Sequence, residues 1–294
     1  MDNILNLEHI FKFIDKSTIL NDICFSLSAG EIVGFIGPNG SGKSSTMKII
    51  TSLWQASSGQ VLIANKNINT HREEALADLS AMIEYPMLYS ELSGHENLKI
   101  IAWLRNVNNT RINEIESLIQ LRTAIHKPVK TYSLGMKQRL MLGMCLLPKP
   151  KLLLLDEPTN GLDPTGVSTF LSLIKEHANK DQTAVLISSH QLHHLENLCD
   201  RFIYIKNGTI ITPTYNSSYT RYQLMVDRPL ELDHMIKTQF ECETTTIENG
   251  IIITIDQKTT LNMILQTCHS NNIMIKQIDR LIRTIEEEYS EIYQ

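Results

Sequence analysis

Apolar residues in the first 211 positions form short continuous runs that alternate with longer stretches of helical periodicity. The runs at 31–37, 151–158 and 183–190 are mainly apolar and have the length of buried strands. The stretches 45–54 and 166–180 repeat apolar residues at the spacing of an α-helix. Strands of this kind separated by helices predict a parallel α/β sheet that is covered on both faces.

Antiparallel and helical parts are expected around this sheet. Further strands are predicted at 4–14, 18–30 and 58–68, and helices over most of 72–147. The first two of these strands would form an edge β-layer. A final hairpin is predicted at 201–211, because Asn207-Gly208 favours the type I′ turn that joins two paired strands.

The chain changes character after residue 211. The polar, turn-rich segment TPTYNSS at 212–218 predicts a linker. Beyond it, 219–294 alternates strand and helix patterns in the order β-α-β-β-α-β-α, and the first six of these match a ferredoxin-like arrangement. We therefore expect a main domain at 1–211 and a small C-terminal α+β domain at 219–294.

Composition narrows the classes of function. Of 294 residues, 42% are hydrophobic and 20% are charged, which suits a folded protein with a sizeable core. The net charge is −5, and the acidic excess lies entirely from Pro213 onward, where 7 basic residues face 12 acidic ones. A nucleic-acid binder needs a basic face, so we expect no nucleic-acid partner.

Cysteine use and hydropathy also exclude some classes. The five cysteines are scattered and form no C-x-x-C motif, which predicts reduced thiols rather than a disulfide framework or a zinc ribbon. No window approaches 18 apolar residues, and the N-terminus lacks the pattern of a signal peptide. We expect a chain that does not itself span a membrane and that works on one only through a partner.

The segment GPNGSGKS at 37–44 has the spacing G-x-x-x-x-G-K-S and lies between a predicted strand and a predicted helix. Glycines at this place let backbone N–H groups face a phosphate, and the following helix N-terminus favours an anion. Lys43 would reach the β- and γ-phosphates, and the Ser44 hydroxyl would bind Mg²⁺. The predicted nucleotide-binding residues of this segment are Gly37, Asn39, Gly40, Ser41, Gly42, Lys43, Ser44 and Ser45.

Two carboxylates follow the apolar run LLLL, at the C-terminal end of a predicted strand. Ligands of α/β sheets bind at such strand ends. After a phosphate-binding loop, Asp156 is the candidate Mg²⁺ ligand, and Glu157 is the candidate catalytic base that polarises the attacking water.

The sequence between and beyond these motifs resembles the ATP-binding-cassette (ABC) ATPases. Gly37–Ser44 is similar to their Walker A motif, and Leu152–Glu157 to their Walker B motif. YSLGM at 132–136 occupies the position of the signature motif, where Ser133 and Gly135 match phosphate-contacting residues. Further matches in the family's order are NGLD at 160–163, which resembles the D-loop, and His190, which resembles the switch histidine. The resemblance covers residues 1–211.

The resemblance implies a fold and an assembly. The family fold combines a RecA-like P-loop core, an antiparallel β-subdomain and a helical subdomain. Two chains pair head-to-tail, so that each signature motif closes on the ATP of the other chain. The implied cofactors are ATP and Mg²⁺, and the implied partners are a second ATPase chain and an integral-membrane permease.

Three positions depart from the usual family pattern. In the signature motif, Leu134 replaces a glycine and Met136 replaces a glutamine, as in drug- and peptide-exporter branches. Glu84 stands where the Q-loop glutamine would bind Mg²⁺ and contact the permease. Glutamate at that place resembles the lantibiotic-immunity branch, and the signature and C-terminal extension resemble bacitracin-type exporters.

Two assignments have alternatives. As the switch residue, His190 would contact the γ-phosphate; the alternative is a zinc site with the nearby histidines and Cys199, whose spacing lacks the H-E-x-x-H pattern. The resemblance implies an aromatic residue that stacks on adenine a few positions before Leu20, where this chain has Ile14. Phe13 is the nearest aromatic to that position, Phe11 is the alternative, and either could belong to the β-layer core.

The resemblance predicts the ATP-hydrolysing subunit of an exporter that removes an antimicrobial peptide from the membrane through a separate permease. The chain would then lie at the cytoplasmic face of the cell membrane as a peripheral protein. The alternatives are the ATPase of another ABC exporter, for a drug or a lipid, and a non-transport ABC ATPase. A third hypothesis is that the acidic C-terminal domain is a regulatory module that senses a ligand in an otherwise ordinary transporter.

Overall fold

The computed structural model describes residues 3–83, 88–211, 220–240, 242–255, 260–281 and 285–293. The chain divides into two units, Met1–Thr212 together with Tyr293, and Pro213–Ile292 together with Gln294. Glu84 and the predicted linker at 212–218 lie outside the described residues. Within the described ranges, no helix combines the length and apolar character needed to cross a membrane.

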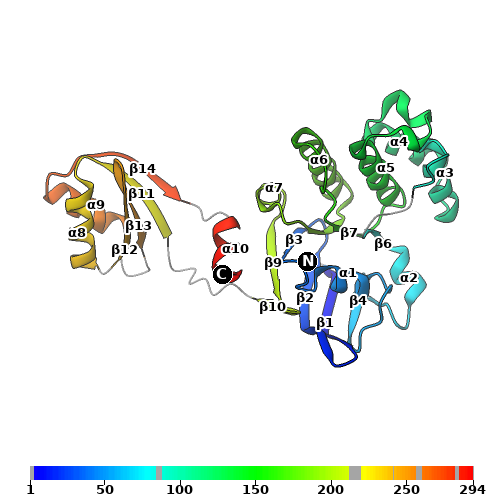
Figure 1. The fold of residues 1–294 in the computed structure, drawn as a ribbon, viewed down its shortest axis with the longest axis horizontal. Coiled ribbons are helices and arrows are strands. Elements are labelled where there is room, and N and C mark those ends of the chain that lie inside the picture. Colours follow the sequence, from blue (N-terminus) through cyan, green and yellow to red (C-terminus); the bar gives the residue numbers. More distant parts are fainter. Residues whose placement is uncertain are drawn as a thin grey trace. The chain divides into compact units, whose positions relative to one another are not determined.

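A six-stranded sheet forms the centre of the first unit (Figure 1). Its order is β10-β9-β3-β8-β7-β6, and every neighbouring pair is parallel except β9 and β10. The strands are β3 (Ile32–Ile36), β6 (Leu79–Met82), β7 (Leu152–Asp156), β8 (Ala184–Ser188), β9 (Arg201–Lys206) and β10 (Thr209–Ile211). The structure thus confirms the predicted parallel α/β sheet and the Asn207-Gly208 hairpin, whose two turn residues both have positive φ.

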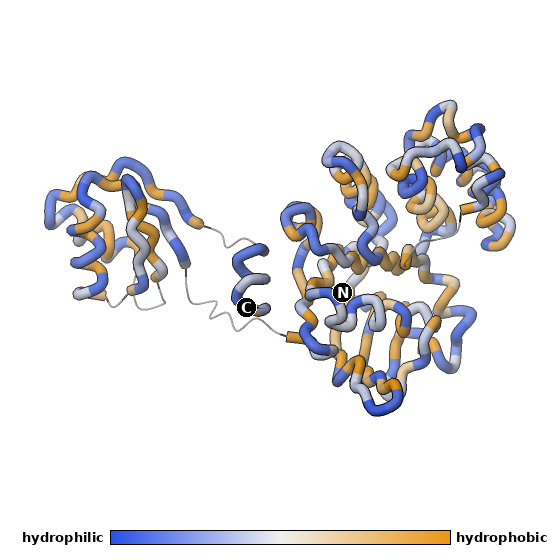
Figure 2. The backbone as a smooth tube through the Cα atoms, viewed as in Figure 1, coloured by the Kyte–Doolittle hydropathy of each residue, from blue (hydrophilic) through white to orange (hydrophobic). Residues whose placement is uncertain are grey.

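The central strands are apolar at every position because each face of the sheet meets a different core. Along β7, Leu152 and Leu154 belong to one buried cluster, whereas Leu153 and Leu155 belong to the other. Figure 2 shows the apolar character of the strands at the centre of this unit. Because both faces of the sheet are covered, every apolar position of the central strands β3, β7 and β8 is buried, which accounts for the continuous apolar runs in the sequence.

A second, antiparallel sheet of order β2-β1-β4-β5 covers one face. It consists of β1 (Asn3–Ile14), β2 (Ser17–Ser28), β4 (Ser58–Ile63) and β5 (Lys66–Asn67). Helix α1 (Lys43–Ile50) shares one buried cluster with this sheet and with β3, so it lies packed between the two sheets. The single strand predicted at 58–68 is wrong in one respect: Ala64 and Asn65 take left-handed conformations and form a turn that divides it.

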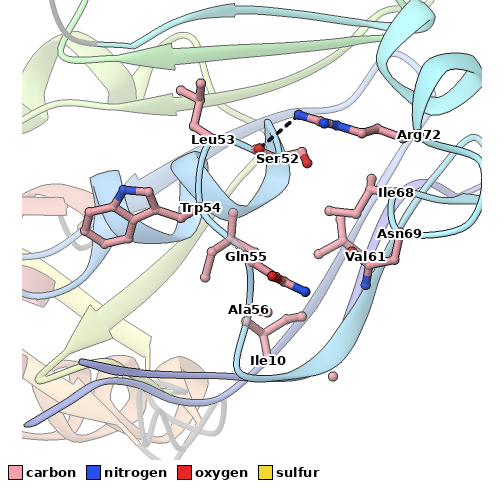
Figure 3. Close-up of a pocket in the computed structure, with 12 residues that line it drawn as sticks. Ile10, Ser52, Leu53, Trp54, Gln55, Ala56, Val61, Ile68, Asn69 and Arg72 are labelled. Carbon is pink, nitrogen blue, oxygen red and sulfur yellow. Dashed lines mark hydrogen bonds between the residues drawn. The ribbon is translucent and has the colours of Figure 1, made fainter. Parts of the chain in front are cut away.

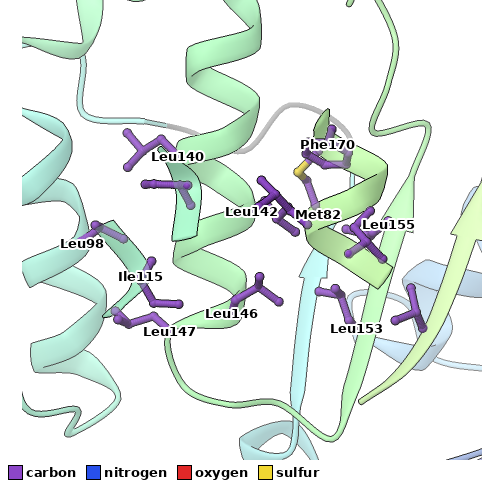
Figure 4. Packing of buried hydrophobic residues seen from close by; sticks show 14 of the residues in the cluster. Met82, Leu98, Ile115, Leu140, Leu142, Leu146, Leu147, Leu153, Leu155 and Phe170 are labelled. Atoms are coloured by element: carbon purple, nitrogen blue, oxygen red, sulfur yellow. The ribbon is translucent and has the colours of Figure 1, made fainter. Parts of the chain in front are cut away.

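Helices cover the other face and extend into a helical lobe. They are α3 (Gly94–Leu104), α4 (Asn109–Ile119), α5 (Leu134–Leu146), α6 (Pro164–Asp181) and α7 (Leu192–Glu196), with 3₁₀ turns at Arg122–His126 and Val129–Thr131. The short helix α2 (Arg72–Ala77) instead packs with the antiparallel sheet, because Ala75 belongs to the buried cluster on that side. Leu98, Ile115 and Leu140 from the lobe join Leu153 and Phe170 in one cluster (Figure 4). The mostly helical prediction for 72–147 is right except for β6, a strand of four residues held by its pairing with β7.

The second unit is an antiparallel sheet of order β12-β13-β11-β14 with helices against it. Its elements are β11 (Thr220–Val226), α8 (Pro229–Phe240), β12 (Glu243–Ile247), β13 (Gly250–Ile255), α9 (Leu261–Ser270), β14 (Ile275–Leu281) and α10 (Ile285–Tyr293), except that Tyr293 itself belongs to the first unit. Leu232 and Ile236 of α8 and Ile264 of α9 pack with Ile251 and Ile253 of β13. The β-α-β-β-α-β order, with the first and third strands central, is that of split-βαβ folds.

Candidate functional site

The carboxyl ends of three neighbouring strands place the predicted site residues at one edge of the central sheet. β8 lies between β3 and β7, with Phe35 and Asp156 both paired to Ser188. Gly37 follows β3 directly, and Glu157 follows β7 directly. Parallel strands end at the same edge, so the phosphate-binding loop and the two carboxylates converge there.

The loop that leaves β3 turns into α1 through Gly42. Gly42 is the N-cap of the helix and has a φ of 115°, a conformation that L side chains rarely adopt. Lys43, Ser44 and Ser45 form the first turn, with no acidic residue among them. Free N–H groups and the helix dipole at this end together favour an anion.

Lys43 is held inside this loop. Its side chain is buried, and Nζ donates hydrogen bonds to the carbonyl oxygens of Gly37 at 2.6 Å and Pro38 at 3.2 Å. Burial lowers the pKa of Lys43, and the nearby carboxylates of Glu157 and Asp156 oppose that shift. A phosphate bound in the loop would add negative charge beside the ammonium and favour its charged form further.

The loop also contains an unsatisfied polar atom. Ser41 is 3% exposed, and its Oγ finds no hydrogen-bond partner in the part of the chain that the structure describes. A buried hydroxyl without a partner is costly, and a phosphate oxygen would satisfy it. Asn39 and Gly40 lie exposed at the tip of the loop. These residues therefore fit a nucleoside triphosphate.

Ser188 organises the two acids on the neighbouring strand. Its buried hydroxyl donates to Asp156 Oδ1 at 2.6 Å and accepts from the Glu157 backbone N–H at 2.9 Å. The Asp156 carboxylate is thereby oriented by a neutral donor, which leaves its other oxygen available for a cation. Our sequence analysis did not single out Ser188, although its position at the end of an apolar strand was a usable signal.

Glu157 and His190 contact each other at the same edge. Glu157 has a φ of 50°, a left-handed conformation that is uncommon outside glycine and marks a constrained position. His190 Nδ1 lies 2.8 Å from Glu157 Oε2, and the His190 backbone N–H donates to the same oxygen at 3.3 Å. A carboxylate only accepts, so this short contact requires the proton on Nδ1 and leaves Nε2 as the free ring nitrogen.

The predicted Mg²⁺ ligands come from different elements. Ser44 lies in the first turn of α1 and Asp156 ends β7, whereas Glu84 lies outside the described residues. A hydroxyl and a carboxylate are hard oxygen donors of the kind that Mg²⁺ prefers. The donor set thus fits this ion, with ATP phosphates and water completing its coordination.

The signature segment lies in the helical lobe, away from the P-loop. Ser133 is the N-cap of α5, is exposed, and its Oγ accepts from the Met136 N–H at 3.3 Å. In the described ranges, no hydrogen bond or ion pair joins Ser133 or Gly135 to residues 37–44. The structure thus places Ser133 and Gly135 at the start of α5, with no hydrogen bond to the P-loop among the described contacts.

One link connects the signature helix to the D-loop. Gln138 of α5 is buried, and its Nε2 donates to the Asn160 carbonyl at 3.0 Å, while its Oε1 is buried without a partner in the described part of the chain. Leu162 of the D-loop also lies beside Gly135. The sequence offered no signal for Gln138, because its partner is a backbone carbonyl 22 positions away.

Phe13 lies near the end of β1 with 49% of its surface exposed. It stacks on Phe11, with ring centroids 6.3 Å apart. Its exposure argues against the core alternative, and its role toward adenine stays a prediction.

A separate pocket lies at the other end of α1 (Figure 3). Leu53, Trp54 and Gln55 line it beside Arg72. Helix α1 has eight residues and is therefore about 12 Å long. Because the P-loop lies at the N-terminal end of this helix, the pocket is not the nucleotide site.

Comparisons with known proteins place this geometry in a family. The ABC transporter family model matches residues 20–160. The ABC transporter ATP-binding protein YhcH of Bacillus subtilis is 34% identical over 299 residues, which cover 99% of this chain and 96% of that protein. The lantibiotic transport ATP-binding protein SrtF of Streptococcus pyogenes is 37% identical over 207 residues, covering 70% of this chain and 89% of SrtF. The bacitracin transport ATP-binding protein BcrA of Enterococcus faecalis is 28% identical over 300 residues, covering 99% and 97%.

Solved structures agree with the sequence matches. An ATP-binding subunit of an ABC transporter superposes with a TM-score of 0.66 and 28% identity, covering 71% of this chain and 88% of that one. An ABC-transporter ATP-binding cassette in its ADP conformation has a TM-score of 0.65 and 25% identity, covering 72% and 91%.

Proposed function

Because this chain belongs to the ATP-binding proteins of ABC transporters and is an ATPase, we propose that it powers export of an antimicrobial peptide of the lantibiotic or bacitracin kind. The observation that carries the ATPase chemistry is the convergence of Lys43, Asp156 and Glu157 at one sheet edge. The peptide class is supported by the similarity to SrtF and BcrA, the latter extending through the C-terminal unit.

At the site, each group has a distinct task. The loop around Gly42, with Lys43 and the Ser41 hydroxyl, binds the phosphates of ATP. Ser44 and Asp156 would hold Mg²⁺, which neutralises phosphate charge. Glu157 accepts a proton from the attacking water, and His190 positions that carboxylate by its contact to Oε2.

The assembly in this proposal is a head-to-tail homodimer. Ser133 and Gly135 lie at a helix N-terminus, which favours an anion, and they make no contact with their own P-loop in the described residues. In a two-fold dimer, each signature would complete the site of the other chain. The dimer would bind beneath a permease at the cytoplasmic face of the membrane.

Glu84 is the proposed point of coupling to the permease. A carboxylate can bind Mg²⁺ as an amide oxygen can, but as an Mg²⁺ ligand at the position of the Q-loop glutamine it would add negative charge beside Asp156, Glu157 and ATP. Close like charges repel unless a cation compensates them. We therefore assign Glu84 a use in coupling that outweighs this cost.

Survival of cells challenged with a lantibiotic or bacitracin tests the proposal, with ATP turnover of the purified chain measured in parallel. Cells that carry the permease and the Lys43→Ala chain should be as sensitive as cells without the chain, because this variant cannot bind the phosphates. Equal survival of Lys43→Ala and wild-type cells would contradict the peptide-export function.

Variants of Glu84 separate coupling from hydrolysis. Glu84→Gln should keep the ATP turnover of the isolated chain but reduce survival, whereas Glu84→Ala should reduce both because no oxygen ligand remains. Glu73→Gln, an exposed change on α2, is the matched control and should alter neither. Full protection by Glu84→Gln would contradict the coupling role and leave the ATPase assignment intact.

A further inference from the structure

Two consecutive β-bulges interrupt the pairing of β1 and β2, upstream of the P-loop in the sequence. Leu7 pairs with Phe25 and Ile10 with Ile23, so Glu8 and His9 oppose Cys24 alone. The next pair is Lys12 with Leu20, so Asn21 and Asp22 oppose Phe11 alone. One bulge therefore lies on each strand, on either side of the buried pair Ile10 and Ile23.

The bulges place three chemically different side chains on one exposed face. His9 and Asp22 have φ values of 50° and 57°, so both take the left-handed conformation that non-glycine residues usually avoid. Gly59 of β4 lies so close to the His9 carbonyl that a Cβ there would clash with it. Because Ile23 points into the core, Asp22 and Cys24 on either side of it point outward, beside His9.

The three side chains lie within contact distance of one another. His9 Nδ1 is 2.8 Å from Asp22 Oδ1, and Cys24 Sγ is 3.6 Å from each of these atoms. The His9 backbone N–H also donates a hydrogen bond to Cys24 Sγ at 3.1 Å, which holds the sulfur beside the imidazole.

This geometry suits chelation and not a proton relay. In a Cys-His-Asp relay, the imidazole uses one nitrogen for the thiol and the other for the carboxylate. Here the same atom, His9 Nδ1, faces both Cys24 and Asp22. Three donors that converge on one point can instead share a metal ion.

The distances between the three donor atoms agree with tetrahedral coordination of one metal ion. Zn–S bonds of about 2.3 Å and Zn–N or Zn–O bonds of about 2.0 Å give edges of about 3.5 Å from sulfur and about 3.3 Å between nitrogen and oxygen. The observed sulfur distances of 3.6 Å match, and only the hydrogen-bonded His9–Asp22 pair, at 2.8 Å, must widen. The side chains of His9 and Asp22 are 76% and 51% exposed, so water can occupy the fourth coordination position of the ion.

We propose that His9, Asp22 and Cys24 form a binding site for one Zn²⁺ ion on the outer face of the antiparallel sheet. The mixed sulfur, nitrogen and oxygen donors select a borderline transition metal, whereas Mg²⁺ prefers oxygen ligands alone. The site is therefore independent of the Mg²⁺ ligands Ser44 and Asp156, and it does not depend on the proposed transport function.

Titration of the full reduced chain with Co²⁺ tests the site, because a thiolate–Co²⁺ bond gives a charge-transfer band in the near ultraviolet. One equivalent should produce the band, stoichiometric Zn²⁺ should remove it, and excess Mg²⁺ should not. Cys24→Ser should abolish the band, and His9→Ala should weaken Zn²⁺ binding at least about tenfold, since even outer-shell partners cost 10–100-fold.

Matched controls distinguish this site from other donors. His269→Ala removes an exposed histidine of the second unit, and Cys199→Ser removes a thiol of the main unit; both should keep the band. ATP turnover should be unchanged in His9→Ala, which shows that the variant is folded. A missing band in the wild-type chain, or a band of equal intensity in Cys24→Ser, would overturn the proposal.

Discussion

The P-loop region and the signature region are both proposed to contact ATP phosphates, yet the structure stabilises them differently. At the sheet edge the groups position one another, because Ser188 orients Asp156 and His190 contacts Glu157. The carboxylates of Asp156 and Glu157 also oppose the lowering of the Lys43 pKa by burial. At the start of α5, Ser133 is exposed and its hydroxyl only caps its own helix.

This difference fits the proposed dimer, in which one chain forms the sheet-edge half of the site by itself. The sheet-edge half is preorganised by hydrogen bonds between neighbouring strands, and within the described ranges its buried Ser41 Oγ has no hydrogen-bond partner. The signature half connects to it only loosely, through Gln138 and Asn160 among the described contacts. If a second chain completes the site, the signature half is expected to be exposed and to have few contacts with the P-loop of its own chain.

The largest effect should come from the sheet-edge half. Glu157→Gln keeps the side-chain shape but removes the base, so ATP turnover should fall by about 10²–10⁴-fold while ATP binding remains. A phosphate-release assay and a nucleotide-binding titration measure the two quantities. Glu176→Gln, an exposed change on α6, should alter neither. Turnover above a tenth of wild type in Glu157→Gln would assign the base elsewhere.

A comparable loss should follow from the signature half, but only in the dimer. Ser133→Arg should abolish hydrolysis and leave ATP binding by the single chain intact, because in the proposed dimer Ser133 serves the other chain's site. Mixing this variant with Lys43→Ala chains should restore part of the activity, since a mixed dimer has one intact composite site. Lost ATP binding by monomeric Ser133→Arg would contradict the head-to-tail arrangement.

An intermediate effect is expected when the sheet-edge network is weakened without removing a ligand. Ser188→Ala takes away the donor to Asp156 and the acceptor for the Glu157 N–H. Loss of such a supporting contact costs about 10–100-fold in activity or metal affinity. The Mg²⁺ concentration that gives half-maximal ATP turnover should therefore rise. Ser172→Ala on α6 is the control. An unchanged Mg²⁺ dependence would show that Ser188 does not orient Asp156.

The smallest effect should come from the link between the two halves. Gln138→Leu loses the bond to the Asn160 carbonyl but also removes the buried, unpartnered Oε1. These contributions oppose each other, so the unfolding free energy should change by less than about 1 kcal/mol. Chemical denaturation measures that change. Turnover should fall a few-fold because the D-loop is released, and unchanged turnover would remove Gln138 from the communication between halves.

Sequence patterns predicted the secondary structure well where one environment surrounds a whole element. β7 and β8 are buried on both faces, so an unbroken apolar run identified them. The pattern failed for β6, because four residues are too few to distinguish a strand from the surrounding helices and its partner β7 lies about 70 positions later. It also missed the turn inside 58–68, where the left-handed Ala64 and Asn65 carry no glycine signal.

For the site, the chemistry of each motif could be predicted because it is local. The P-loop carries its phosphate-binding groups within eight residues, and Asp156 and Glu157 are adjacent in sequence. The family resemblance is confirmed by the matches over most of the chain. The roles of the individual site residues stay predictions, and Glu84 lies outside the described residues.

The neighbours of these motifs could not be predicted in this way. Strand order depends on pairing between distant segments, and no pattern within β3 or β7 shows that β8 lies between them. That placement is what gives Ser188 its contacts to Asp156 and Glu157. The bulges that gather His9, Asp22 and Cys24 likewise arise from the register of two strands against a third. The local sequence determines the chemistry of each motif, because the groups involved are neighbours along the chain. Strand order and register, which depend on long-range packing, determine which side chains contact that motif.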